Sequence, residues 1–193
     1  ASGNFMWAKS MGSISSDWGR SIAVDYAGNV YTTGQFESTV DFDPGNDTSI
    51  HTSNGNLDIF IQKLDANGNF VWAKTFGGSN DDKGNSIAID VTGNIYITGN
   101  FKNTVDFDPR SGISNLISNG GNDIFIMKLD SSGNFVYAKN IGGSYDDSGF
   151  SLALDTSANV YITGSFTDIT DFDSGIGVFN LTSNGNEDIF ITK

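Results

Sequence analysis

The sequence predicts an all-β fold built from three copies of one 65-residue unit. The first observation is the repeat itself, because GNFMWAK at residues 3–9 returns as GNFVWAK at 68–74 and as GNFVYAK at 133–139. The second is the composition, in which 24 Gly and 15 Phe but only two Pro indicate short strands and many turns. The repeat places the units at residues 1–65, 66–130 and 131–193, and together they form one domain.

Each unit contains four short runs with the composition of β-strands. In the second unit they are residues 70–74 (FVWAK), 86–90 (SIAID), 94–98 (NIYIT) and 123–128 (DIFIMK). The pattern Asp-x-x-Gly-Asn joins the second run to the third, and the fourth run of one unit to the first run of the next. Glycine supplies the positive φ of a tight hairpin there, and the aspartate accepts its amides. The chain is therefore predicted to be an antiparallel meander of twelve strands with negligible helix.

Both faces of each small sheet are predicted to be buried, because apolar residues are consecutive at 59–61 (IFI) and 95–97 (IYI). Small residues, Ser86 and Ala88, alternate along one run, which suits an innermost strand crowded near an axis. Such sheets are the blades of a β-propeller. We therefore expect three four-stranded antiparallel blades, each taking its outermost strand from the following unit.

Three blades are too few to surround an axis, so the chain is expected to be part of a larger propeller. The end strands at residues 5–9 and 188–193 would each lack a partner, and the outer faces of the end blades would expose apolar residues. Further blades of the same protein or a second copy of the chain would complete the ring. Further blades are favoured, because both ends fall inside a repeat.

A longer compound motif links the sequence to a known family. Residues 86–99 (SIAIDVTGNIYITG), 123–130 (DIFIMKLD) and 142–147 (GGSYDD) resemble the bacterial seven-bladed β-propeller repeat family. Residues 104–109 (TVDFDP) resemble the version of this repeat found in large secreted and surface proteins of Bacteroidetes. The resemblance implies a secreted or cell-surface propeller-repeat protein, and it transfers no catalytic residue.

Charge and residue usage exclude several functional classes. Ten Lys and Arg against 23 Asp and Glu give a net charge of −13, which disfavours nucleic acids and anionic membrane surfaces as partners. With no Cys and with His51 as the single histidine, the chain lacks the usual metal and nucleophile sets. His51 has leucine at its equivalent positions and is interpreted as a dispensable loop residue. No apolar run is long enough for membrane insertion.

Two groups of acidic residues recur in every unit and are expected on one rim. One group consists of the Asp-Phe-Asp pairs Asp41 and Asp43, Asp106 and Asp108, and Asp171 and Asp173. Alternate carboxylates suit Ca²⁺, but Arg110 follows one pair, so capping of loop amides is the favoured interpretation and Ca²⁺ the alternative. No other cofactor is expected. The other group is Asp17, Asp82 and Asp147, which we interpret as turn or blade-to-blade hydrogen bonds, because an active site is seldom copied into every blade.

Residues outside the repeat are the candidates for ligand binding, and they are Trp18, Asp47, Arg110 and Tyr145. Trp18 is expected to lie in a loop. An enzyme would need a unique polar cluster, and the sequence shows none. We therefore expect a non-catalytic module for adhesion or for binding a protein or a glycan. The alternatives are an architectural spacer or shaft of a large surface protein, or a non-catalytic domain attached to a secreted hydrolase.

Overall fold

The computed structural model describes residues 2–108, 110 and 112–193. Pro109, which closes the TVDFDP motif, lies outside the described residues. The described part of the chain forms eleven strands and no helix, and it therefore contains no helix that could cross a membrane. The strands are β1 (Trp18–Val24), β2 (Val30–Asp41), β3 (Ile50–Leu64), β4 (Phe70–Phe76), β5 (Lys83–Ile89), β6 (Ile95–Asp106), β7 (Asn115–Leu129), β8 (Phe135–Gly143), β9 (Ser148–Leu154), β10 (Val160–Asp171) and β11 (Asn180–Thr192).

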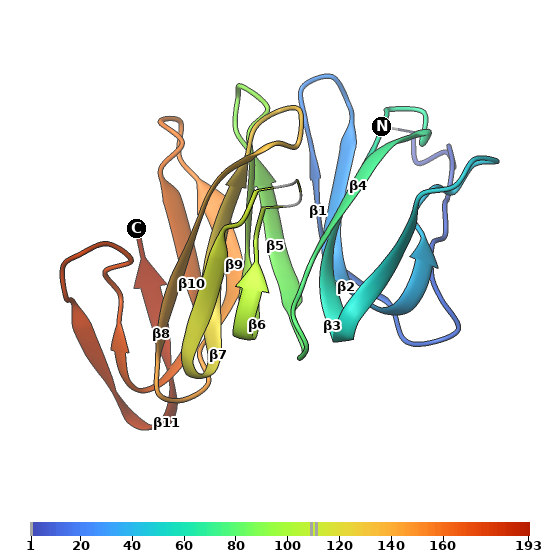
Figure 1. Ribbon diagram of the computed structural model, residues 1–193. Helices are drawn as coiled ribbons and strands as arrows, with labels where there is room; N and C mark the ends of the chain where they lie inside the picture. The colour runs from blue at the N-terminus through green and yellow to red at the C-terminus, as the bar shows by residue number, and fades with distance from the viewer. Residues whose placement is uncertain (1, 109, 111) are drawn as a thin grey trace.

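The strands form three consecutive antiparallel blades that stand side by side (Figure 1). The first blade has the order β1-β2-β3-β4, the second β5-β6-β7-β8 and the third β9-β10-β11. A short pairing of Thr170 and Asp171 in β10 with Gly143 and Gly142 in β8 joins the second and third blades into one sheet. The fold is a partial β-propeller, as the sequence predicts.

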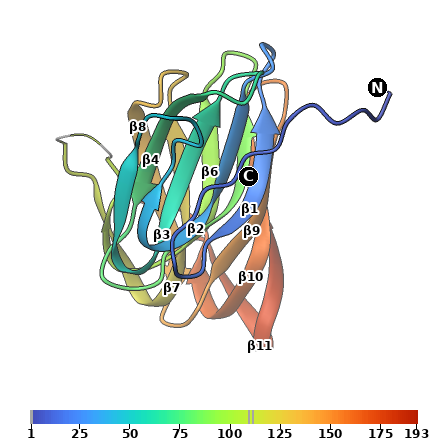
Figure 2. The ribbon, with the colours of Figure 1, turned by 90° about the vertical axis from the view of Figure 1, so that its right-hand side faces the viewer.

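The number of strands differs from the prediction at both ends of the chain. The third blade has three strands instead of four, and residues 5–9 belong to no sheet. The physical reason is the same in both cases, because the outermost strand of a blade pairs with the third strand of that blade, as β4 pairs with β3. The segment at residues 5–9 has no such strand within the chain, and Figure 2 shows the start of the chain extending away from the sheets before it reaches the first blade.

The predicted hairpin turns are confirmed. At the turn between β5 and β6, the Asp90 carboxylate accepts the backbone amides of Thr92 and Asn94 at 2.8 and 2.9 Å, and Gly93 has a φ of 84°. The same turn recurs at every hairpin between the first and second strands of a blade, with Ala158 at a φ of 59° in the third copy. This repeated turn fixes the register of the first two strands.

The second strand of each blade turns a sharp corner that the sequence did not predict. Ser38, Asn103 and Asp168 lie at these corners with φ values of 68°, 61° and 60°. Beyond the corner the chain folds back as a two-stranded ribbon, which extends β2 and β3 well past their predicted ends. In the first blade this brings Phe42 to 5.2 Å from Phe36, measured between ring centroids. The connection between β2 and β3 therefore packs on its own blade.

Apolar side chains fill the spaces between the blades. The largest cluster joins Ile59 and Ile61 of β3 to Ile87 of β5 across the first junction. A second cluster joins Ile124 of β7 to Leu152 of β9 across the next junction. Because each blade covers the face of its neighbour, both faces of the central sheet are buried, as predicted.

Candidate functional site

Each ribbon ends in a loop, and the three loops have the same hydrogen bonds at their bases. We call them the ribbon loops; they are residues 42–49, 107–114 and 172–179. In the first, Asp41 Oδ1 accepts the amides of Asp43 at 3.0 Å and Ser49 at 2.8 Å, which ties the two ends of the loop together. The same two bonds recur at Asp106 and Asp171 with the same lengths. The base of each ribbon loop therefore has one fixed geometry.

The second carboxylate of each pair also accepts amides. Asp43 Oδ1 accepts the amide of Gly45 at 2.7 Å, and Asp108 Oδ1 accepts the amide of Arg110 at 3.1 Å. Amide capping by the Asp-Phe-Asp pairs is thus confirmed. Within the described residues, no group of three or more His, Cys, Asp or Glu side chains is placed to hold a metal ion. Calcium binding stays a prediction with its own test, given in the Discussion.

The tips of the ribbon loops, in contrast, differ in every copy and are exposed. The exposed tip residues are Asn46 and Asp47 in the first loop, Arg110 and Ile113 in the second, and Ile176 and Val178 in the third, beside which Phe179 of the loop base is also exposed. The first tip is polar and acidic, the second combines a cation with an apolar side chain, and the third is apolar. One scaffold therefore presents three chemically different tips.

The structure separates the four residues that were predicted to bind a ligand. Asp47 and Arg110 are on ribbon-loop tips, and Asp47 lines a depression of about 200 Å³ beside the turn that joins β3 to β4. Trp18 begins β1 and Tyr145 lies between β8 and β9, so both belong to the opposite rim, where the outermost strand of one blade leads into the next blade. Trp18 is therefore a strand residue and not a loop residue as predicted.

The same geometry corrects the expectation that both groups of aspartates lie on one rim. Because each ribbon folds back, the Asp-Phe-Asp pairs lie towards the turn between the third and outermost strands, and Asp43 lines a depression with Gly68 and Asn69 of that turn. Asp17, Asp82 and Asp147 stay at the other rim. The ribbon changes direction where the pairing of β2 with β3 is interrupted. Glu37 pairs with Leu57 and Thr39 with Thr52, so residues 53–56 of β3 are left over at this point.

Asp82 connects two blades, as predicted for the aspartates that precede each innermost strand. Its carboxylate accepts the amides of Gly78 at 2.7 Å and Lys102 at 2.9 Å, and its own amide donates to the carbonyl of Leu57 in the preceding blade at 2.7 Å. Asp147 repeats this arrangement at the next junction. Burial raises the pKa of Asp82 to about 7.

A second buried aspartate at each junction was missed by sequence reasoning. Asp58 in β3 and Asp123 in β7 are buried, and the Oδ1 atom of each has no hydrogen-bond partner. Burial raises the pKa of Asp58 to about 6 and that of Asp123 to about 7. The signal was present, because an aspartate precedes the Ile-Phe-Ile run in all three units.

His51 is also placed differently from its prediction. It lies in β3, half-buried, with Nδ1 at 3.1 Å from Thr75 Oγ1 and its ring edge-on to Phe42 at 5.6 Å. Burial, followed by the charge of Lys74, lowers the pKa of His51. The strand includes His51 because the ribbon extends β3 back to Ile50.

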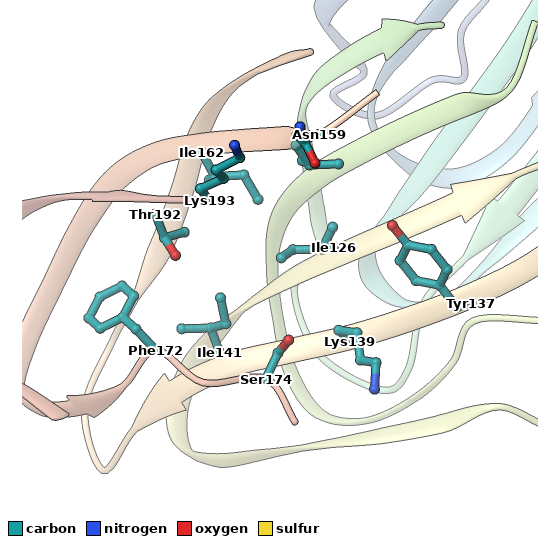
Figure 3. Close-up of a pocket in the computed structure, with 11 residues that line it drawn as sticks. Ile126, Tyr137, Lys139, Ile141, Asn159, Ile162, Phe172, Ser174, Thr192 and Lys193 are labelled. Carbon is teal, nitrogen blue, oxygen red and sulfur yellow. The ribbon is translucent and has the colours of Figure 1, made fainter. Parts of the chain in front are cut away.

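A hollow of about 500 Å³ lies between the second and third blades (Figure 3). Tyr137 and Lys139 of β8 line one side of it, and Ile162 and Lys193 line the other. At the equivalent place between the first and second blades, Trp72 packs against the turn at Gly133. The hollow is thus an unfilled blade junction rather than a pocket shaped for a small molecule.

Comparisons with known proteins agree with this architecture. Residues 11–35 and 71–100 match the family described as Beta-propeller repeat. The chain is 31% identical over 127 residues to an uncharacterized WD repeat-containing protein of Acanthamoeba polyphaga mimivirus, covering 58% of this chain and 9% of the relative. It is 24% identical over 137 residues to the regulatory protein FlaEY of Caulobacter vibrioides, covering 71% of this chain and 14% of the relative.

The strand order and the repeated contacts define a partial β-propeller, and two segments of it are similar to the β-propeller repeat. The chain spans only 9% and 14% of the lengths of the two curated relatives, so it corresponds to a small part of each.

Proposed function

We propose that this chain is a non-catalytic binding module, part of a secreted or cell-surface protein, and that its ribbon-loop tips contact a protein partner. The observation that carries the proposal is the contrast within each ribbon loop. The base is repeated with the same two hydrogen bonds in all three copies, whereas the exposed tips differ in chemistry. Fixed scaffolds with variable loops are a common arrangement for recognition.

The chemistry of the tips favours a protein over a glycan as the partner. Ile176 and Val178 expose large apolar side chains at one tip, with Phe179 of the loop base beside them, and another tip exposes Arg110 and Ile113. Arginine and large apolar side chains are typical anchors of protein interfaces, where they are desolvated in pockets of the partner. We expect the third tip to supply most of the binding energy.

The polar groups that recur in every unit support a non-catalytic role. The buried aspartates Asp82 and Asp147 hold blade junctions, and the paired aspartates close loops. The single histidine is packed between Thr75 and Phe42. These aspartates and the histidine therefore have structural partners.

The proposal is tested by selecting peptides from a phage-displayed random library on the immobilised chain. A tip variant replaces Arg110, Ile113, Ile176, Val178 and Phe179 with serine and leaves every base aspartate in place. The selected peptides are expected to bind this variant at least tenfold more weakly than the wild-type chain.

A matched control variant carries Tyr26→Ser and Val91→Ser at exposed hairpin turns that are not part of the ribbon loops. It is expected to retain peptide binding. Peptides that bind the tip variant as well as the wild type would refute the proposal. Binding to a glycan array that is lost only in the tip variant would keep the site but replace the protein partner with a carbohydrate.

A further inference from the structure

The two ends of the blade stack expose side chains that the interior junctions bury. Ile189 and Ile191 in β11 are 83% and 79% exposed, although their equivalents Ile59 and Ile61 in β3 are 0% exposed. At the opposite end Ile22 in β1 is 64% exposed, whereas its equivalent Ile87 is 5% exposed. Each end therefore carries one half of an interior junction.

The interior junctions show what the missing halves must be. Ile59 and Ile61 pack against Ile87 of the next blade, in the largest apolar cluster. Ile87 donates its amide to Ser21 Oγ of the preceding blade at 3.3 Å. The second junction repeats this bond, from Leu152 to Ser86 Oγ at 3.1 Å. The exposed β11 face is thus complementary to the exposed β1 face, and neither face is complementary to itself.

The N-terminal segment lies on the first blade as the outermost strand of a preceding blade would. Met11 packs against the cluster of Phe36 and Phe42, and the Trp7 indole donates to the carbonyl of Ala66 at 3.3 Å while its ring covers Gly68. Within the chain, Phe76 and Trp72 of β4 pack on the second blade in the same way. The segment is positioned as a strand and lacks only its neighbour.

The backbone of the N-terminal segment also has the conformation of the hairpin turns. Gly3 has a φ of 74°, close to the 78° and 79° of Gly68 and Gly133. In the chain, Gly133 is the residue that packs against Trp72. The hollow beside Tyr137 is the equivalent place at the last junction, and it has the size and lining to receive a glycine turn and a strand (Figure 3).

We propose that the chain assembles head to tail with a second copy of itself. The segment at residues 3–11 of one copy adds to β11 of the other as the missing fourth strand, and the β1 face of the first copy covers Ile189 and Ile191 of the second. Two copies that exchange these contacts at both ends form a closed ring of six blades. This assembly is independent of ligand binding by the ribbon-loop tips.

The repeat specifies the register of the joined strands. In β3 and β4, Ile59 pairs with Phe76 and Gln62 with Ala73, and the second blade uses the same register. By equivalence Ile189 of one copy pairs with Met11 of the other, and Thr192 pairs with Ala8. The amide of Asp17 then donates to the carbonyl of Glu187, as Asp82 donates to Leu57.

A second copy is the occupant that the chain itself specifies. Residues 3–9 repeat the sequence of residues 68–74 with one change, Met6 for Val71, so the edge of β11 meets a strand of the type that β3 and β7 already bind. The two end surfaces differ, so the contact is heterologous, and a heterologous contact forms either a closed ring or an open filament. Ring closure gives the edge of β11 a partner strand at both joints.

Light scattering on the purified chain tests the assembly. The expected mass is about 41 kDa, twice the 20.6 kDa of one chain. The variant Ile189→Glu with Ile191→Glu is expected to be monomeric, because both side chains are exposed in the single chain and the substitution affects only the joint. The control Ile113→Glu with Ile176→Glu alters equally exposed side chains on the ribbon loops and is expected to keep the wild-type mass.

Cysteine cross-linking tests the orientation and the register, and the natural chain has no Cys to interfere. Mixing Thr192→Cys protein with Ala8→Cys protein is expected to give a disulfide-linked pair. Replacing Ala8→Cys by Lys9→Cys moves the thiol to the other face of the strand and is expected to reduce the yield at least tenfold.

Three results would overturn the proposal. The first is a wild-type mass of one chain throughout the micromolar range. The second is a mass that grows with concentration beyond two copies, which indicates a filament. The third is Thr192→Cys protein that cross-links to itself as readily as to the Ala8→Cys protein, which indicates a symmetric contact instead of a head-to-tail one.

Discussion

Aspartates have two different structural roles in this chain, and the two kinds differ in how deeply they are buried. The turn aspartates such as Asp90 are largely accessible and hold hairpin amides, and their hydrogen bonds lower the pKa of Asp90 to about 2 despite an opposing effect of burial. The junction aspartates such as Asp82 are buried between blades, where the loss of hydration raises the pKa. Both kinds recur in the sequence, but the sequence pattern alone does not distinguish their burial.

Removing the Asp82 carboxylate should weaken the first blade junction. Asp82→Ala leaves the buried amides of Gly78 and Lys102 without an acceptor, so we expect a loss of about 2 kcal/mol in the free energy of unfolding. The neighbouring Asp81 is exposed and forms a surface ion pair, so Asp81→Ala should change the stability by less than about 0.5 kcal/mol. Urea denaturation of both variants measures the difference, and equal losses would contradict the role of Asp82.

The junction aspartates also set a pH dependence of stability. Asp82 and Asp123 have a pKa of about 7 in the folded chain against 3.8 for the unfolded residue, so the folded chain binds more protons between these pH values. The free energy of unfolding should therefore be highest near about pH 4 and fall as the pH rises to about 7. Below about pH 4 the turn aspartates, whose folded pKa values are lowered, become protonated and stability falls again.

Urea midpoints measured across this pH range test the slope. The charges facing these groups are acidic, with Asp58 and Asp81 near Asp82, and Asp147 near Asp123. The double variant Asp58→Asn with Asp123→Asn should flatten the decline towards neutral pH. A wild-type midpoint that rises steadily from acid to neutral pH would show that these carboxyls ionise normally.

At the scale of the strands, the sequence predicts what local chemistry specifies and misses what distant contacts impose. The Asp-x-x-Gly-Asn turns and the innermost strands are local, and they were predicted correctly. The corner at Ser38 was not, because serine is a weak signal for a positive φ and the ribbon beyond it is held by Phe42 packing on Phe36 and Phe60. The predicted strand at residues 5–9 failed because its partner strand is not in the chain.

The same reasoning applies to the ribbon loops. Aligning the units reveals that the tips vary, and Asp47 and Arg110 were identified in this way. The apolar residues Ile176 and Val178 were overlooked because isolated apolar residues in a loop are normally packed, and only the fold shows that they are exposed. The corner also places Asp47 and Arg110 on the rim opposite to Trp18 and Tyr145, and this separation could not be predicted before the corner was known.

A close contact in the second strand should make Gly99 intolerant of a side chain. A Cβ atom at Gly99 would collide with the Lys83 carbonyl and the Phe125 ring, and neither can move without disturbing the blade. We expect Gly99→Ala to reduce the free energy of unfolding by about 3 kcal/mol. Thermal unfolding compares Gly99→Ala with the wild-type chain, and equal melting temperatures would contradict the predicted collision.

Calcium should have little effect on stability, because the Asp-Phe-Asp carboxylates already accept loop amides such as those of Asp43 and Ser49. Replacing chelator with millimolar Ca²⁺ is expected to shift the melting temperature by less than about 2 °C, since only an ion that binds the folded chain stabilises it. A shift of several degrees that is lost in the triple variant Asp41→Asn, Asp106→Asn, Asp171→Asn would instead establish a metal site at the loop bases.

At the scale of the whole molecule, a repeated stack of blades carries loop tips that differ from copy to copy. The repeated residues fill the blade junctions, and Asp82 and Asp147 form backbone hydrogen bonds across them. The ribbon-loop tips change between copies, as Asp47 and Ile176 show. Blades that depend on their neighbours in this way should unfold together rather than singly.

Native-state hydrogen exchange shows whether the blades unfold together. The amides of Asp82, Asp147 and Leu152 cross blade junctions, so they should exchange only when the whole stack opens and should share one free energy of opening. The amides of Asp47 and Ile176 at the tips should exchange at rates close to those of an unstructured chain. Junction amides that exchange as fast as the tip amides would show that the blades separate readily, and would contradict the account.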